Sequence, residues 1–366
     1  MTKTQEIIMA LIVSGIGHRR EFYIPDAVDW QEVFQLSQEH GVAAIVLDGL
    51  EIIKGERTNI SDEALPSREL TLKWIGMVLR QYEQRYITYE KNTQDLAAFY
   101  RKYGIRMMMI KGYGLSLNYP KPNHRPCGDM DIFLFGGQER ADQLIYKELG
   151  IEVDKSHHHH TVFKFHGETV ENHYDFLNVH VRPSNKRIEA KLKELANLNL
   201  DVNDNQKADN IYFPSVEFNA IYLLRHCAAH FASTEMTVRQ VLDWGLFMEK
   251  NHQEINWDEY LPYIKQEGMF RFYNLLGLFC VRHLGFNASI FHGLDSDELF
   301  ERFRNEIMEP EFKDRENGNL LWSLWVKPRR WWHNRWKNRL CYIESAWEEF
   351  VYGLWAKVLK PSHFIQ

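Results

Sequence analysis

The sequence predicts an α+β fold in which a small mixed sheet lies between mostly helical N- and C-terminal regions. Residues 1–95 carry apolar side chains at helical spacing, as in WQEVFQLSQEHGVAAIVLDGL. Two short apolar runs and a hairpin pattern follow between residues 105 and 176. From residue 188 onward the spacing is helical again. These observations divide the chain into three regions, 1–95, 96–187 and 188–366.

Among the N-terminal helices, the first needs to be separated from a signal peptide. The run IIMALIVSGIG is interrupted by glycines and is not followed by a small-residue cleavage site, so we interpret it as a short buried helix. A long amphipathic helix follows over residues 70–104. It ends at Gly104, where glycine can adopt the left-handed conformation of a C-cap.

The central region alternates between strands and helices. IRMMMIKG, residues 105–112, suits a buried strand, and DMDIFLFGG, residues 129–137, begins a second one. QERADQLIYKELG is a compact helix closed by a glycine, and TVFKFHGETVENHYDF is typical of a hairpin that turns at Gly167. After residue 188 the clearest segments, SVEFNAIYLLRHCAAHF, MTVRQVLDWGLFMEK and MFRFYNLLGLFCVRHLG, are helical, and the last hundred residues carry no strand signal.

Composition and charge narrow the class of protein. The chain has 366 residues, 45% hydrophobic and 26% charged, and its net charge of −6 argues against a wholesale nucleic-acid binder. Its four cysteines lie far apart without a CxxC pair, which suits a reducing compartment. No run approaches the ~20 apolar residues of a membrane span. We therefore expect a cytoplasmic protein without a transmembrane segment.

Two carboxylates, separated by a single residue, lie at the start of the second apolar run. Asp129 and Asp131 point to the same face of a strand, because the side-chain period of a strand is two. Neighbouring carboxylates repel unless a cation lies between them, and Mg²⁺ prefers oxygen ligands. We therefore expect the pair to bind Mg²⁺ (or Mn²⁺). The alternative is that these acids form ion pairs with Arg125 or Lys111.

The flanking residues supply further parts of a phosphoryl-transfer site. Lys111 and Gly112 end the preceding strand, where a glycine lets the backbone approach a phosphate and the turn into a helix offers N–H groups. Arg125 adds positive charge near the acids. Glu171 and Asp175 on the hairpin share one strand face, so either could be a third acid.

The stretch IKGYGLSLNYPKPNHRPCGDMDIFLF resembles the signature of the uncharacterised nucleotidyltransferase family, within the DNA polymerase beta-like nucleotidyltransferase superfamily. HHHHTVFKFHGETVENHY is similar to the family's His-rich strand and the acidic-x-His-aromatic strand after it. The resemblance is strong over residues 107–175 and weaker over residues 216–250. It implies a nucleotidyltransferase-like sheet domain and metal-dependent transfer of a nucleoside monophosphate from an NTP to an acceptor.

The resemblance also implies roles for single residues. Asp129, Asp131 and Glu171 would be the catalytic acids and metal ligands, and Glu171 would polarise or deprotonate the acceptor hydroxyl. The nucleotide would bind at Lys111, Gly112 and Arg125. The acceptor stays open among a small molecule, a lipid intermediate and a protein hydroxyl.

One departure from the superfamily keeps a second function open. The superfamily prefers Gly-Ser or Gly-Gly at the phosphate turn, whereas here Gly112 is followed by Tyr113. The alternative is a degenerate nucleotidyltransferase domain that acts as a nucleotide-sensing or protein-binding module.

Several histidines and one ion pair lie outside the signature. His157–His160 favour a solvated loop that binds metal incidentally, although one of them could lean toward the substrate phosphates. His226 and His230 have the i,i+4 spacing of zinc ligands, but the Glu of HExxH is missing, which favours helix packing. Arg239 and Asp243, also at i,i+4, predict an ion pair.

The C-terminal segment Trp325–Leu340 combines six cations and four tryptophans with no acid. Interleaved cations and aromatic rings suit base stacking, anionic lipid headgroups or an acidic partner. The alternative is a closing helix whose tryptophans fill the core while arginine stems cover them.

Overall fold

The computed structural model describes residues 1–18, 24–25, 27–56, 64–180, 182–202, 211–233, 235–312, 329–344 and 347–348. Its N-terminal elements are α1 (Lys3–Gly15), α2 (Trp30–Glu39), α3 (Ala43–Glu56), α4 (Arg68–Val78), a π-helical turn η2 (Leu79–Glu83) and α5 (Gln84–Lys102). The central elements are β1 (Met107–Met109), α6 (Tyr113–Ser116), η3 (Pro122–His124), β2 (Met130–Phe133), α7 (Gln138–Leu149), β3 (His160–Phe165) and β4 (Glu168–His173). The C-terminal elements are α8 (Pro183–Val202), β5 (Ile211–Tyr212), α9 (Val216–Ser233), α10 (Val238–Asn251), α11 (Trp257–Gln266), α12 (Phe270–Leu284), η4 (Ala288–Ile290), α13 (Phe300–Met308) and α15 (Arg335–Cys341).

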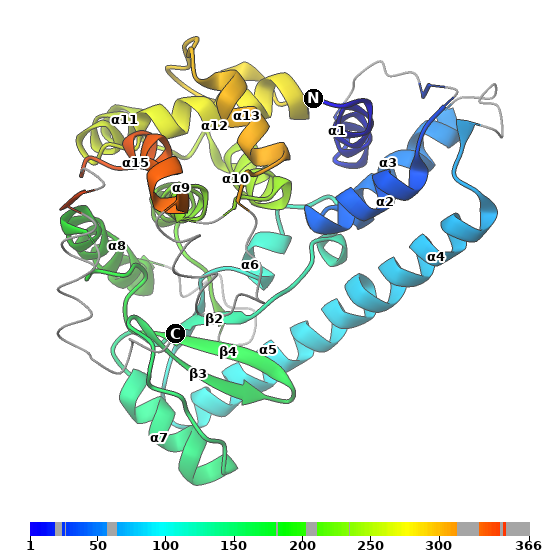
Figure 1. Cartoon of the computed structure of the whole chain (residues 1–366). Helices are drawn as coiled ribbons and strands as arrows, with labels where there is room; N and C mark the ends of the chain where they lie inside the picture. Colours follow the sequence, from blue (N-terminus) through cyan, green and yellow to red (C-terminus); the bar gives the residue numbers. More distant parts are fainter. Residues whose placement is uncertain are drawn as a thin grey trace.

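The strands form one mixed sheet in the order β3-β4-β2-β1-β5. β2 runs parallel to β4 and antiparallel to β1, while β3 and β4 form the predicted antiparallel hairpin. His166 and Gly167 at its turn both have positive φ, 48° and 91°, as the tight primed hairpin turns require. The predicted α+β fold, with a small mixed sheet between helical regions, is confirmed (Figure 1).

One strand, β5, lies in the region predicted to be helical from residue 188 onward. Ile211 and Tyr212 form β5, which pairs with β1 in parallel at the edge of the sheet. Two residues are too few to show a periodicity, so tertiary pairing alone defines this strand.

The two faces of the sheet contribute to different hydrophobic cores. Met107, Met109 and Ile132 pack with residues of α5 and α7. Met108 and Phe133, which alternate with them along β1 and β2, join the larger core built by the N- and C-terminal helices. Strand alternation therefore directs every second side chain of the central strands toward the helical region.

The N-terminal and C-terminal helices share that larger core. α1 packs against both α3 and α12, and in Figure 1 helices α1–α3 lie beside the later helices rather than apart from them. Near the end of α1, the His18 ring lies 2.8 Å from the Leu284 carbonyl oxygen at the end of α12. α5 also continues through residue 95. The boundaries 1–95, 96–187 and 188–366 stay predictions.

The predicted long helix is present as α4, η2 and α5 in direct succession, Arg68 to Lys102. In Figure 1 it forms one rod whose C-terminal end lies under the sheet. Gly104 follows with a positive φ of 68°, as expected of the glycine that stops the helix.

The basic segment Trp325–Leu340 is described from residue 329 onward, and residues 325–328 lie outside the described residues. Its described part has both buried and exposed side chains. Lys337 is buried and pairs with Glu306 at 2.6 Å, and Trp336 packs against Phe231 of α9. Trp332 is 65% exposed, with Arg335 stacked on its ring.

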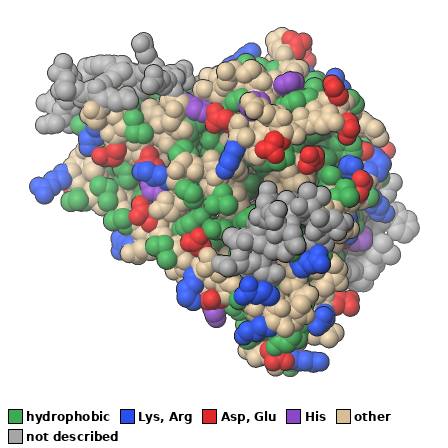
Figure 2. Space-filling model, turned by 180° about the vertical axis from the view of Figure 1, so that it is seen from behind, with side chains coloured by type: hydrophobic (Ala, Val, Ile, Leu, Met, Phe, Trp, Pro, Cys, Tyr) green, Lys and Arg blue, Asp and Glu red, His purple; other side chains and the backbone are tan. Residues whose placement is uncertain are grey.

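All four cysteines are buried free thiols. On the face seen from behind in Figure 2, charged side chains of both signs are interspersed with apolar ones. Within the described ranges, no helix has the length and apolar character needed to cross a bilayer.

Candidate active site

The acids of the site lie on the sheet face that is turned toward the helical region. In β2, Met130 and Ile132 point to the α5 side, so Asp131 between them points to the other side. β2 and β4 run parallel in a register that places Asp131 directly beside Glu171. The two predicted acids, 40 residues apart in the sequence, are therefore neighbours on one sheet face.

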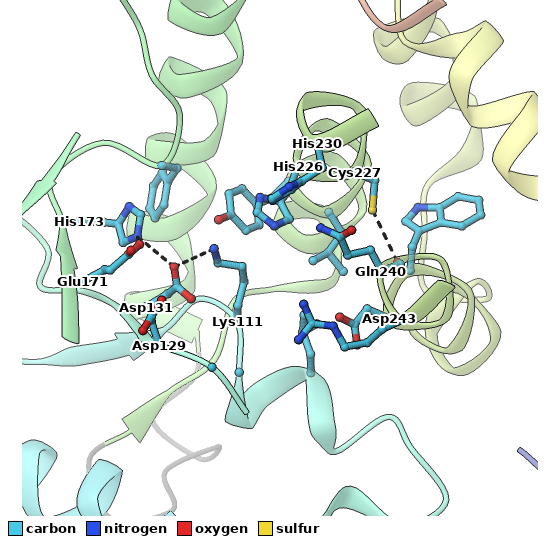
Figure 3. A pocket seen from close by; sticks show the side chains of 18 of the residues that line it. Lys111, Asp129, Asp131, Glu171, His173, His226, Cys227, His230, Gln240 and Asp243 are labelled. Atoms are coloured by element: carbon cyan, nitrogen blue, oxygen red, sulfur yellow. Dashed lines mark hydrogen bonds and ion pairs between the residues drawn. The ribbon is translucent and has the colours of Figure 1, made fainter. Parts of the chain in front are cut away.

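His173, two residues after Glu171, completes a compact cluster. Its Nε2 lies 3.1 Å from Asp131 Oδ1 and 3.4 Å from Glu171 Oε2 (Figure 3). One donor atom from each of these three residues lies within 4.8 Å of the other two, a set that could hold a metal ion. Sequence reasoning missed His173, although its place two residues from Glu171 puts both on one face of the strand.

Lys111 supplies the cation beside Asp131 in this structure. Its Nζ lies 2.7 Å from Asp131 Oδ1, and both side chains are largely buried. Asp131 thus forms the ion pair with Lys111 that the alternative names, while metal binding by the acids stays a prediction. Arg125 does not contribute, since its guanidinium binds another carboxylate.

The charges of this cluster support one another. Burial opposes ionisation of Asp131, but Lys111 and His173 outweigh it and hold the pKa of the Asp131 carboxyl well below its usual value. Burial also opposes the charge of Lys111 and His173, yet the facing carboxylates raise the pKa of both. The hydrogen bond with His173 lowers the pKa of Glu171. Both acids are thus carboxylates at neutral pH.

Asp129 lies at the entrance to β2 and is exposed. Its side chain lines the same cavity, and partial burial together with the nearby Glu171 charge raises its pKa. Its backbone is fixed, because the Tyr89 hydroxyl donates to the Asp129 carbonyl at 3.1 Å. A Cβ on Gly112 would stand 2.2 Å from that hydroxyl, and Gly112 has a positive φ of 59°. The glycine therefore allows Tyr89 to hold the start of the acidic strand.

A cavity of about 460 Å³ opens between the sheet and helices α9 and α10. It brings together all six predicted site residues, which are Lys111, Gly112, Arg125, Asp129, Asp131 and Glu171. Figure 3 shows Lys111 and Asp131 on one side and the α9 residues His226 and His230 on the other. Asp175 does not line this cavity. It forms an ion pair with Lys193 of α8, beyond the end of β4.

The Arg125 guanidinium holds the loop before β2 against α10. It donates to both carboxylate oxygens of Asp243, at 2.7 and 2.9 Å, and the Tyr119 hydroxyl donates to the same carboxylate at 2.7 Å. Arg239 is thereby left without Asp243, so the predicted i,i+4 ion pair is wrong. The Arg239 side chain lines the cavity and has no ion pair within the described part of the chain.

The α9 histidines line the cavity, whereas their spacing favoured helix packing. His226 and His230 contact each other edge to face, with ring centroids 4.6 Å apart. Burial lowers the pKa of both, that of His230 to about 4, so both are neutral at pH 7. No sequence signal distinguishes a cavity-lining histidine pair from a packed one when the glutamate of HExxH is absent.

The four-histidine tract reaches the same cavity at its C-terminal end. His159 and His160 line the cavity, and His157 stacks on His160 with ring centroids 4.6 Å apart. Burial lowers the pKa of His159 to about 3 and that of His160 to about 4. The tract is therefore only partly the solvated loop that its composition favoured.

One comparison with known proteins identifies the family of the chain. A family model described as uncharacterised nucleotidyltransferase matches residues 26–285, more than half of the chain. The chain belongs to this family. The match covers β1 to β4 and the α9 and α10 wall of the cavity, so it takes in the whole site. Neither a curated protein nor a solved structure matches the chain.

Membership supports nucleotidyl transfer as the general activity and a nucleotide as substrate. The buried acidic and histidine groups include sets that could bind a divalent metal.

Proposed function

We propose that the protein is a metal-dependent nucleotidyltransferase that moves a nucleoside monophosphate from an NTP to a hydroxyl acceptor. The observation that carries the proposal is the pairing of Asp131 with Glu171 on adjacent parallel strands, with Lys111 beside them, at the wall of one cavity. A cluster of carboxylates with a neighbouring lysine suits a triphosphate and its counterions.

The residues fit Mg²⁺ or Mn²⁺. Asp129, Asp131 and Glu171 would hold the ion, because Asp131 and Glu171 lie side by side on one sheet face, Asp129 lines the same cavity, and Lys111 already places a positive charge beside Asp131. When bound, the ion supplies positive charge that polarises the acceptor hydroxyl and neutralises charge developing on the phosphates. Lys111 would then be free to turn toward the triphosphate. Gly112, which has no side chain, would leave room for the triphosphate.

The reaction forms one bond and breaks another. The acceptor oxygen attacks the α-phosphorus, the bond from that phosphorus to the bridging oxygen of pyrophosphate breaks, and Glu171 takes the hydroxyl proton. Since His173 lowers the pKa of Glu171, this carboxylate is a weak base and needs a hydroxyl that is already polarised. Arg125 would act at a distance by fixing the loop before β2, rather than by contacting the nucleotide.

The runner-up function is a nucleotide-sensing or protein-binding module. The phosphate turn favours it, because Gly112 is followed by Tyr113 and the helix that starts there has only four residues. Such a helix offers little of the dipole and few of the N–H groups that hold phosphates in longer helices.

Incubation with each labelled NTP, Mg²⁺ or Mn²⁺ and a cell extract tests the proposal and searches for the acceptor at once. The expected result is a labelled product that requires metal and disappears with Asp131→Asn. Metal-dependent nucleotide binding without any labelled product would favour the sensing module. The screen also separates small molecules, lipid intermediates and protein hydroxyls as acceptors, since these partition differently.

For the C-terminal segment we propose an anionic partner that contacts its exposed cations. In the described part of Trp325–Leu340, Arg329 and Arg339 are exposed, as is Trp332. Serine at Arg329, Arg330 and Arg335 should weaken binding to anionic vesicles or acceptor while the melting temperature is kept. A large fall in melting temperature without selective loss of binding would assign the segment to the core.

A further inference from the structure

We propose that His159, His160 and His173 form a second metal site, for a divalent transition metal of the Zn²⁺ class. This site goes beyond the proposed function, because it has a different donor set and a different ion from the Mg²⁺ site of the carboxylates.

The hairpin itself brings the first two rings together. His160 and His173 are directly opposite each other in the antiparallel register of β3 and β4, so their side chains lie on the same face. Their ring centroids are 5.1 Å apart.

A backbone clamp adds the third ring. The N–H groups of Tyr174 and Asp175 both donate to the His159 carbonyl, at 3.0 and 3.1 Å, and fix this residue against the end of β4. The His159 ring centroid then lies 4.4 Å from that of His160 and 5.5 Å from that of His173. One nitrogen from each ring lies within 4.8 Å of the other two. Zn–N bonds of about 2.0–2.1 Å in a tetrahedron place donors roughly 3.3–3.4 Å apart, so small side-chain rotations would close the site.

Two of the candidate donors lack a partner. The Nδ1 atoms of His159 and His160 are buried and have no hydrogen-bond partner among the described residues. Buried polar atoms are satisfied in most native structures, so two orphaned ring nitrogens in one cluster call for a ligand. A metal ion is a ligand that accepts several imidazole nitrogens at once.

The donor set decides the class of ion. Imidazole suits Zn²⁺, Co²⁺, Ni²⁺ and Cu²⁺, whereas Mg²⁺ prefers oxygen. Three imidazole ligands bring no negative charge, but Glu171 Oε1 lies 3.9 Å from His160 Nε2 and can compensate the charge of the ion. Three histidines also leave a fourth coordination position, as in zinc sites that keep one place for water or substrate.

Co²⁺ is the probe that tests the site, because four-coordinate Co²⁺ absorbs strongly in the visible range and Mg²⁺ is silent. The full chain, stripped of metal with a chelator, is titrated with Co²⁺ and then with Zn²⁺. We expect one equivalent of Co²⁺ to bind with a four-coordinate spectrum, to be displaced by Zn²⁺ and to resist excess Mg²⁺. Absence of a saturable spectrum in the folded protein would overturn the site.

Variants assign the ligands, and the tract provides its own control. His159→Ala should weaken Co²⁺ binding by more than about 100-fold, since losing even an outer-shell partner typically costs about 10–100-fold. His158→Ala, one residue away and outside the cluster, should keep the wild-type affinity. If both variants weaken binding equally, the tract binds metal only incidentally and the site is wrong.

A third variant separates this site from the carboxylate site. If the Co²⁺ spectrum survives His159→Ala but vanishes with Asp129→Asn, the ion belongs to the carboxylates and the inference fails. Circular dichroism of the metal-free variants checks their folding, and His159→Gln replaces His159→Ala if the latter does not fold. The absorption readout needs no turnover, so its failure would leave the proposed nucleotidyl transfer untouched.

Discussion

Replacing Asp131 with Asn tests whether the acid is part of a buried charge network. The substitution keeps the size of the side chain but leaves Lys111, which lies 2.7 Å away, without its counterion, and leaves His173 facing a neutral amide. Removing one partner of a buried ion pair costs about 3–5 kcal/mol. Lys111 lines a cavity and can reach water, so we expect the lower end, about 3 kcal/mol.

The expected change in melting temperature follows from the size of the chain. At about 2.1 cal/mol/K per residue, 366 residues give an unfolding entropy of roughly 0.8 kcal/mol/K if the chain unfolds as one unit. A loss of about 3 kcal/mol then lowers the melting temperature by about 4 °C. Mg²⁺ with an NTP at about 100 times its dissociation constant should add about 2.7 kcal/mol to the wild type and nothing to Asp131→Asn.

Two further variants complete this test by calorimetry or urea unfolding. Asp129→Asn is the matched control, because Asp129 is exposed, and we expect it to change the metal-free stability by less than about 0.5 kcal/mol. The double variant Lys111→Met/Asp131→Asn should be less destabilised than the sum of the two single variants. If Asp131→Asn melts like Asp129→Asn without ligand, Asp131 carries no buried charge pair and the electrostatic account of the site is wrong.

Three other predictions follow from single contacts. Glu171→Gln should lower turnover by about 10²–10⁴-fold and keep nucleotide binding, as expected on loss of a general base. Asp175→Asn should leave turnover unchanged. If Asp175→Asn lowers turnover and Glu171→Gln does not, Asp175 is the third acid. His124 lies 2.6 Å from one acid of α3 and 3.0 Å from one of η2, and these bonds raise its pKa against the effect of burial. The stabilisation that His124 contributes should therefore be complete below pH ~6.5 and be lost as the pH rises through the pKa of His124 in the folded state. Urea unfolding at several pH values should show this dependence of the unfolding free energy on pH in the wild type and a weaker dependence in His124→Gln. Gly112→Ala should lower the stability of the fold by at least about 1–2 kcal/mol, because Gly112 has a positive φ. Adding Tyr89→Phe to this variant should recover part of the loss in thermal melts. An unchanged melting temperature in Gly112→Ala would contradict the close approach of the Tyr89 hydroxyl to Gly112.

Local patterns were sufficient for most of the fold. The hairpin, the two apolar strands and the helices closed by Gly104 and Gly150 each carry a period or a cap that depends only on neighbouring residues. The DxD spacing likewise fixes the common face of Asp129 and Asp131, because that face follows from the strand period alone. β5 could not be predicted from the sequence, because two residues are too few to show a strand period.

Long-range pairing was beyond sequence reasoning. Asp243 has a suitable cation four residues earlier on its own helix, but it binds Arg125, 118 residues away, and no local pattern ranks these two partners. The same holds for Asp131, because the sequence offered Lys111 and Arg125 as possible partners and only the folded structure shows that the partner is Lys111. His173 entered the site through the register of β2 and β4, which follows from the complete sheet.

The contact between α1 and α12 has a consequence for synthesis of the chain on the ribosome. Nine of the 13 residues of α1 are buried in the finished protein, yet α12 ends at Leu284. At roughly 5–20 residues per second, about 13–55 s separate the emergence of the two helices. During that interval a largely apolar N-terminal helix lacks part of its final packing surface and is a natural substrate for chaperones. We expect nascent chains stalled before α12 to be recovered with such factors, and chains stalled after α13 to be released from them.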